Sequence, residues 1–114
     1  MKFYSCLWTN PLLLNKEHYQ QHTLLNQKPK EYFSLIEKSF DSFKNLYEDV
    51  AIFCDPLAIE YIKKYTTISK QYLIERDFNI PKEYSEIWSL AKIFCYLELA
   101  KKGDPFCFFD LDTV

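Results

Sequence analysis

Two carboxylates, Asp110 and Asp112, stand two residues apart near the end of the sequence. They follow an unbroken apolar run, Phe106 to Phe109, which predicts a strand buried on both faces. Ligands of open α/β sheets bind at the carboxyl ends of the strands, and hard cations such as Mg2+ or Mn2+ prefer carboxylate oxygens. The spacing therefore predicts a metal and phosphate site. The alternative is that two acidic residues end a strand and face water.

Composition limits the class of protein. The 114 residues predict one domain, and 48% hydrophobic with 26% charged residues is typical of a folded globular chain. Fourteen basic and sixteen acidic residues give a net charge of −2, without a basic run, so we expect no nucleic-acid partner. We find no transmembrane-length apolar run and no signal-peptide core, which predicts a cytoplasmic protein without a membrane span.

Cysteine and glycine usage excludes several kinds of site. The four cysteines show no CxxC spacing and lie among apolar neighbours, which predicts reduced core residues rather than a disulfide scaffold or zinc ribbon. The single glycine, Gly103, excludes the dinucleotide fingerprint and the P-loop, because both need several glycines. Any nucleotide must therefore be held by side chains and metal.

The rest of the chain alternates strand and helix patterns. Apolar runs predict strands, and apolar residues recurring every three or four positions predict amphipathic helices. The expected strands are 3–8, 50–54, a weak edge strand at 71–74, and 105–109; the expected helices are 30–47, one that begins at Pro56, and 84–102, with a loop at 12–28. This order predicts a Rossmann-like α/β fold, with a mostly parallel sheet, helices on both faces and strand 3–8 central among its neighbours.

Two further side chains are expected at the carboxyl edge of this sheet. Asp55 follows the strand 50–54 and precedes Pro56, so it can cap the next helix and also accept hydrogen bonds from a ribose or a base. Lys92 lies one helical turn after Trp88, where its ammonium could reach Asp110 or else extend into solvent. The buried arc expected for that helix contains Ile87, Leu90, Ala91, Phe94 and Leu97, with Trp88, Cys95 and Leu99 along its border.

Four segments together resemble a known family: Phe3 to Pro11, Val50 to Asp55, Glu86 to Lys92, and Pro105 to Asp112. They are similar to the N-terminal half of GT-A-type glycosyltransferases, and in particular to a group of uncharacterised bacterial glycosyltransferase-like proteins. Those proteins open with a strand ending in Trp, carry a W-x-L-x-K helix, and continue into a strand that ends in DxD. The resemblance spans nearly the whole chain, and the helix followed by DxD is its most specific part.

The resemblance implies a nucleotide-sugar donor site. The DxD formed by Asp110 and Asp112 would hold Mn2+ or Mg2+ and meet the ribose and diphosphate, while Lys92 would lie near the phosphates or the donor sugar. The residues that the resemblance assigns to donor binding are Trp8, Thr9, Asn10, Asp55, Trp88, Lys92 and Asp110. No catalytic residue is assigned.

One departure from the family changes the expectation for activity. GT-A enzymes continue well beyond DxD and supply the acceptor site from that second half, whereas this sequence stops two residues after Asp112. We therefore expect either a fragment of a longer protein, which we favour, or a remnant that no longer catalyses; in both cases we expect no activity from this chain alone. A final strand without its neighbour also predicts self-association through the incomplete sheet.

Two other classes of function remain open. The segment Phe109 to Val114 also fits the DxDx(T/V) signature of haloacid-dehalogenase-type phosphatases, in which the first Asp is the nucleophile and the second an acid/base. In that family the motif usually follows the first strand, and a glycine is common where Thr113 stands. The third class is a non-catalytic interaction domain, whose many aromatic residues fill a core or form a partner surface.

Overall fold

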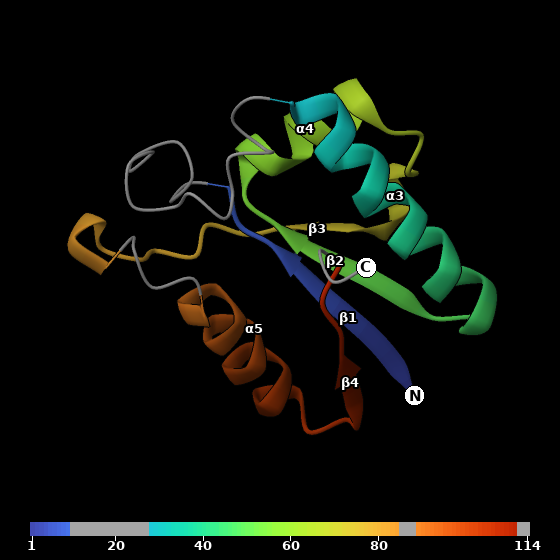
Figure 1. Cartoon of the computed structure of the whole chain (residues 1–114). Coiled ribbons are helices and arrows are strands. Elements are labelled where there is room, and N and C mark those ends of the chain that lie inside the picture. Colours follow the sequence, from blue (N-terminus) through green and yellow to red (C-terminus); the bar gives the residue numbers. More distant parts are fainter. Residues whose placement is uncertain (10–27, 85–88, 112–114) are drawn as a thin grey trace.

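A computed structural model describes residues 1–9, 28–84 and 89–111 of the chain (Figure 1). The strands are β1 (Lys2–Leu7), β2 (Val50–Cys54), β3 (Leu73–Glu75) and β4 (Phe106–Phe108). The helices are α3 (Pro29–Leu46), α4 (Pro56–Tyr65) and α5 (Ser89–Lys102), with short 3-10 turns at Lys70–Tyr72 and Lys82–Tyr84. The loop expected at 12–28 and the start of the helix expected at 84–102 fall largely outside the described residues.

The described strands form one sheet in the order β3-β2-β1-β4, and every pair is parallel. Phe3 lies opposite Val50 on one side and Cys107 on the other, so β1 is flanked by the two strands predicted beside it. After β3 the chain crosses back to place β4 on the far side of β1. The strand order therefore reverses between β1 and β4, which is the place where open α/β sheets bind ligands.

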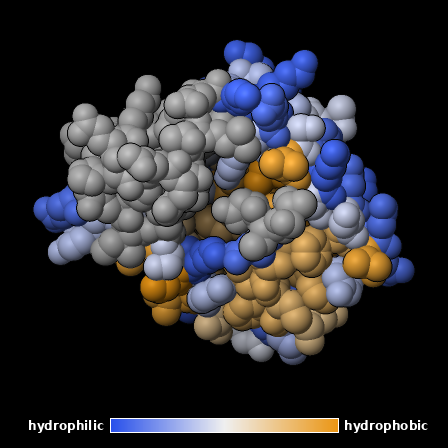
Figure 2. Space-filling model, in the orientation of Figure 1, coloured by the Kyte–Doolittle hydropathy of each residue, from blue (hydrophilic) through white to orange (hydrophobic). Residues whose placement is uncertain are grey.

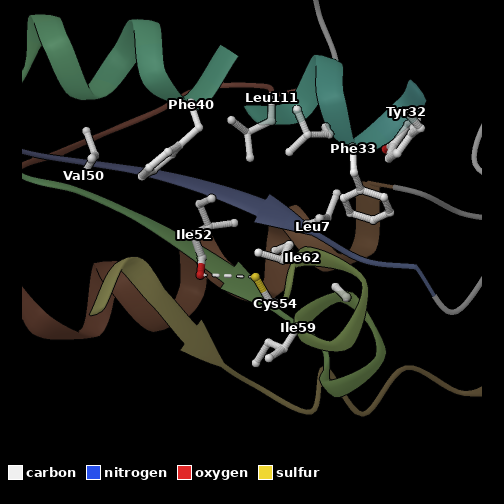
Figure 3. Packing of buried hydrophobic residues seen from close by; sticks show 12 residues of the cluster. Leu7, Tyr32, Phe33, Phe40, Val50, Ile52, Cys54, Ile59, Ile62 and Leu111 are labelled. Atoms are coloured by element: carbon white, nitrogen blue, oxygen red, sulfur yellow. Dashed lines mark hydrogen bonds between the residues drawn. The ribbon is translucent and has the colours of Figure 1, made fainter. Parts of the chain in front are cut away.

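Alternate residues of the central strands serve two cores. Leu7 and Ile52 point into a core under α3 and α4, and Tyr4 and Phe53 point into a second core under α5. Figure 3 shows the first core, where the thiol of Cys54 also donates a weak hydrogen bond to the Ile52 carbonyl at 3.6 Å. Helices thus cover both faces of the sheet (Figure 1), as the alternating pattern predicted.

Helix α3 agrees closely with its sequence pattern. It begins at Pro29, whose fixed φ suits the first helical turn, and it ends at Leu46. Its buried residues, Tyr32, Phe33, Ile36 and Phe40, follow the expected spacing. Full burial of such side chains contributes about 1.5 to 3 kcal/mol each, so this stripe holds the helix on the sheet.

Helix α5 packs through a face that is shifted from the predicted arc toward its border. Its buried residues are Ala91, Cys95 and Leu99, four apart, whereas Leu97 is 60% exposed. Ala91 belongs to the predicted arc, and Cys95 and Leu99 belong to its border. The sheet already presents the rings of Tyr4 and Phe53 on this side, so the small residues Ala91 and Cys95 let the helix approach.

Three smaller predictions can also be compared with the structure. The weak edge strand is present as β3, although Gln71 and Tyr72 belong to the 3-10 turn before it. Gly103 ends α5 with a φ of +80°, a conformation that glycine adopts without strain. All four cysteines are free of disulfides, as predicted. Among the described residues, no helix combines the length and the apolarity needed to cross a membrane.

Candidate functional site

The candidate site lies along the carboxyl ends of β1, β2 and β4. Because the strands are parallel, the residues that follow them share one edge of the sheet. Leu7 lies opposite Cys54 at the ends of β1 and β2, so the residues that come next, Trp8, Thr9 and Asp55, are neighbours. Asp110 follows β4 on the other side of β1. Asn10, Trp88 and Asp112 lie outside the described residues, so their predicted roles remain predictions.

Asp55 joins the ends of β1 and β2. Its Oδ1 accepts a hydrogen bond from the backbone N–H of Thr9 at 3.1 Å, and its Oδ2 accepts one from the Thr9 hydroxyl at 2.9 Å. Thr9 is fully buried, and Asp55 is 8% exposed. We call this pair the Thr9–Asp55 clasp. It fixes the position of the chain as it leaves β1.

The clasp corrects the capping role predicted for Asp55. Asp55 does occupy the N-cap position of α4, and Pro56 follows at the first helical position, but the carboxylate makes no capping hydrogen bond. Its oxygens turn toward Thr9 instead, because Thr9 brings two donors into a buried place where unpaired polar groups are costly.

Burial and hydrogen bonding act on the Asp55 carboxyl in opposite directions. Burial is the larger influence and raises its pKa above the usual value, because it disfavours the charged form. The hydrogen bonds from Thr9 lower the pKa, since they favour the carboxylate. The backbone N–H groups of Asp55 and Ala58 act in the same direction, although neither forms a capping hydrogen bond of good geometry with this side chain. The net result is a raised pKa.

A cavity of about 590 Å3 opens beside the clasp. Trp8, Asp55 and the first turn of α4 form one side, and the loop Asp77–Pro81 forms the other. The ring of Trp8 meets Phe78 edge-on at 6.5 Å between ring centroids. No lysine or arginine is among the described residues that line the cavity. The rings of Trp8 and Phe78 and the carboxylates of Asp55 and Asp77 suit an aromatic group that carries hydrogen-bond donors.

The loop that lines this cavity was not singled out by the sequence. Asn79 adopts a φ of +53° and donates its N–H to the Asp77 carboxylate at 3.0 Å, which gives the loop a fixed turn. Arg76, just before it, donates to Glu98 of α5 through Nε at 2.8 Å and Nη2 at 3.2 Å. The available signal was the polar D-x-N-x-P spacing after an edge strand.

Lys92 and Asp110 form an ion pair at the opposite end of the edge. Both side chains are partly open to solvent, with 38% and 42% exposure. The prediction that Lys92 reaches the end of the β4 strand is confirmed. A cation and an anion are therefore in contact at the place where the strand order reverses, between β1 and β4, and both side chains are partly exposed.

The backbone around Asp110 is held on both sides. The Phe109 N–H donates to the Tyr4 carbonyl at 2.9 Å, and the Phe109 carbonyl accepts from the Ser5 hydroxyl at 2.8 Å. Leu111 is 2% exposed and packs in the core under α3 and α4. Asp110 lies between these two anchored residues, so its carboxylate is presented from a fixed backbone.

The thiols near this edge do not form a nucleophilic site. A hydrogen bond with Cys95, followed by burial, raises the pKa of the Cys6 thiol. Burial, then the charge of Asp55, raises that of Cys54. A raised pKa keeps a thiol protonated and therefore unreactive.

The side chains at this edge offer few ligands for the expected divalent cation. The described residues contain no group of three or more His, Cys, Asp and Glu side chains close enough to hold a metal. Asp110 is a carboxylate of the kind that hard cations prefer and is partly exposed, but the Lys92 ammonium that contacts it would compete with a metal ion, so the described residues alone do not form a metal site. Its expected companion, Asp112, lies outside the described residues.

No family model, curated protein or solved structure matches the chain.

Proposed function

We propose that this domain binds a nucleotide-sugar donor at the carboxyl edge of its sheet, as the resemblance to GT-A-type glycosyltransferases implies. One observation carries the proposal: the edge has two chemically different ends. The cavity beside the clasp has no described cationic lining, whereas the end of β4 carries the Lys92 ammonium. A nucleoside diphosphate has the matching asymmetry, with an uncharged base at one end and phosphates at the other.

The cavity would receive the base and the ribose. Trp8 and Phe78 supply ring surface, and Asp77 and Asn79 supply oxygen acceptors for base or ribose donors. Asp55 would act mainly as a buried wall, because Thr9 already engages both of its oxygens.

The diphosphate would lie at the β4 end. Lys92 would contact phosphate oxygens, and Asp110 with Asp112 would hold Mn2+ or Mg2+. When bound, the divalent cation neutralises charge that the diphosphate brings. No described residue is assigned a catalytic role, so we expect donor binding without sugar transfer by this domain alone.

Calorimetric titration of uridine, guanosine and cytidine diphosphates, with and without Mn2+, tests this proposal. We expect weak binding, about millimolar or near −4 kcal/mol, that strengthens when Mn2+ is present. Asp110→Asn and Asp112→Asn should each weaken the Mn2+-dependent part by about tenfold or more, because a charge-assisted contact is lost. Asp104→Asn changes an exposed carboxylate before β4 and serves as the matched control. Absence of nucleotide binding by the wild type in both conditions would refute the proposal.

We also propose that the domain self-associates through β4, which has no partner strand on its outer side among the described strands. Figure 2 shows a broad apolar area where β1 and β4 lie. On the adjoining surface of α5, Ile93, Tyr96 and Leu97 are exposed, and Tyr96 contacts the rings of Phe106 and Phe108. An apolar strand edge beside an apolar helix surface favours association.

Light scattering after size-exclusion chromatography tests this association. We expect the mass to rise with concentration in the micromolar range and Leu97→Lys to shift the equilibrium toward monomer. Leu46→Lys, at a residue of α3 that is 73% exposed, is the matched control. A wild type that stays monomeric throughout that range would exclude the association.

A further inference from the structure

We infer that two copies of this chain pair through β4 in one defined arrangement: the two β4 strands run antiparallel, and Cys107 of one copy lies opposite Cys107 of the other. The inference rests on the self-association proposed above and specifies its geometry. The arrangement is a closed dimer with a continuous sheet, rather than an open series of copies.

The outward backbone groups of β4 are determined by its pairing with β1. The N–H of Phe109 donates to the Tyr4 carbonyl at 2.9 Å, so the backbone of Phe109 faces β1. Backbone groups alternate in direction along a strand, so the backbone of Cys107 also faces β1, whereas the N–H and C=O groups of Phe106 and Phe108 point outward. Among the described strands, none lies on that outer side (Figure 1).

One symmetric register pairs these outward groups with each other. A two-fold axis at Cys107 places Phe106 of each copy opposite Phe108 of the other, and both residues then exchange N–H···O=C bonds across the axis. Moving the axis by one residue would place Asp104 opposite Phe108, or Asp110 opposite Phe106. The register centred on Cys107 therefore keeps the apolar residues of β4 opposite apolar residues.

Helix α5 adds a second contact on one face of the paired sheet. Its exposed residues Ile93, Tyr96 and Leu97 recur at helical spacing, and Tyr96 meets the rings of Phe106 and Phe108, so this surface of α5 adjoins β4. A two-fold axis perpendicular to the sheet keeps both α5 helices on the same face. A helix above β1 and β4 lies about one strand spacing, roughly 4.8 Å, from an axis beside β4, so the two helices come about 10 Å apart, a normal packing distance.

The α5 surface favours a second copy over another partner. A strand of a different protein could also bond to the open edge of β4. A second copy brings, in addition, the same apolar helix surface to the place where it meets its equivalent. Asp104 would lie opposite Asp110 of the second copy, and like charges in that position weaken the pairing, so we expect a dimer that dissociates in the micromolar range.

Oxidative cross-linking at Cys107 tests the register. Opposite residues that are not directly hydrogen-bonded have Cα atoms about 4.5 Å apart, within the range that a disulfide spans, whereas a displaced register separates the two Cys107 residues by about 7 to 8 Å. At concentrations where light scattering shows association, oxidation with copper phenanthroline should link most of the wild type into covalent dimers. Cys107→Ser should remove the link and keep the reversible dimer. Cys6→Ser, at the other partly buried cysteine, is the matched control and should keep the link.

A displaced thiol provides a second control. Pro105 is exposed, and in the register centred on Cys107 it lies opposite Phe109 of the second copy. Two thiols at position 105 would therefore be too far apart for a disulfide. Pro105→Cys combined with Cys107→Ser should cross-link about tenfold more slowly than the wild type, or not at all. Equal rates in the two proteins overturn the register.

The mass and the cross-link together separate this inference from the proposed association. A mass that stops at the dimer, with a link that requires Cys107, supports the arrangement. Association that continues past the dimer, or a dimer in which Cys107 does not cross-link, supports the association and overturns this arrangement. A wild type that stays monomeric throughout the micromolar range overturns both.

Discussion

The two ends of the edge hold their carboxylates in opposite ways. Asp55 is buried and accepts two hydrogen bonds from uncharged donors of a single residue, Thr9, whereas Asp110 is partly exposed and ion-paired with the Lys92 ammonium. Buried groups are costly to leave unpaired, and exposed ion pairs are readily broken. The first arrangement therefore suits the fixed wall of a pocket, and the second suits a site where partners change. Three measurements can challenge this comparison.

The largest effect is expected from breaking the clasp. Asp55→Ala leaves the N–H and the hydroxyl of Thr9 buried without acceptors, so the free energy of unfolding should fall by about 2 to 4 kcal/mol. Urea unfolding measures this. Asp41→Ala, at an exposed residue of α3, should change stability by less than about 0.5 kcal/mol. Comparable losses in the two variants would mean that the clasp is not the fixed element proposed here.

The pH dependence of stability should report on the same carboxyl. Its pKa in the folded protein is raised above the unfolded value of about 3.9, so its contribution is most favourable below that value. The contribution decreases as pH rises through the folded pKa. The stability of wild type relative to Asp55→Asn should therefore fall as pH increases from 3 to 7. Chemical denaturation across this range checks the sign, and a rising difference would show that the hydrogen bonds from Thr9 outweigh burial.

The smallest effect is expected at the exposed pair. Asp110→Asn should change the free energy of unfolding by about 0.2 to 1 kcal/mol, and added salt should reduce the difference, because exposed charges are screened. A double-mutant cycle with Lys92→Gln isolates the pair. A coupling above about 2 kcal/mol that salt does not change would make this pair as rigid as the clasp.

The sheet could be predicted because burial on both faces leaves a simple pattern. A continuous apolar run such as Val50 to Cys54 predicts a strand that is buried on both faces of a sheet. The apolar residues of α3 recur at helical spacing, which predicts an amphipathic helix. The buried face of α5 was predicted only in part, because Ala91 is buried as expected whereas Leu97 is exposed. The face that packs depends on the rings of Tyr4 and Phe53 across from it. Local sequence carries no information about that partner surface.

The candidate site divides in the same way. The contact of Lys92 with Asp110 followed from a helical position and the end of a strand, both of which are local. The partner of Asp55 could not be predicted in this way, because Thr9 lies 46 residues away in the sequence. The residues next to Asp55 in the sequence were explained by a capping role alone. The cavity loop was missed because irregular backbone has no period, and its turn depends on a single hydrogen bond between Asp77 and Asn79.

The pairing of β4 with β1 also affects how the chain is made. Ser5 and Phe109 are joined by a hydrogen bond across 104 residues, and Phe3 lies opposite Cys107. During synthesis β1 emerges early and can pair with β2, but its other side must wait until residues 106–109 have left the ribosome. Contacts this distant in sequence slow folding, and an open strand in a nascent chain is prone to wrong pairing. Until β4 has formed, one edge of β1 is therefore an open strand edge.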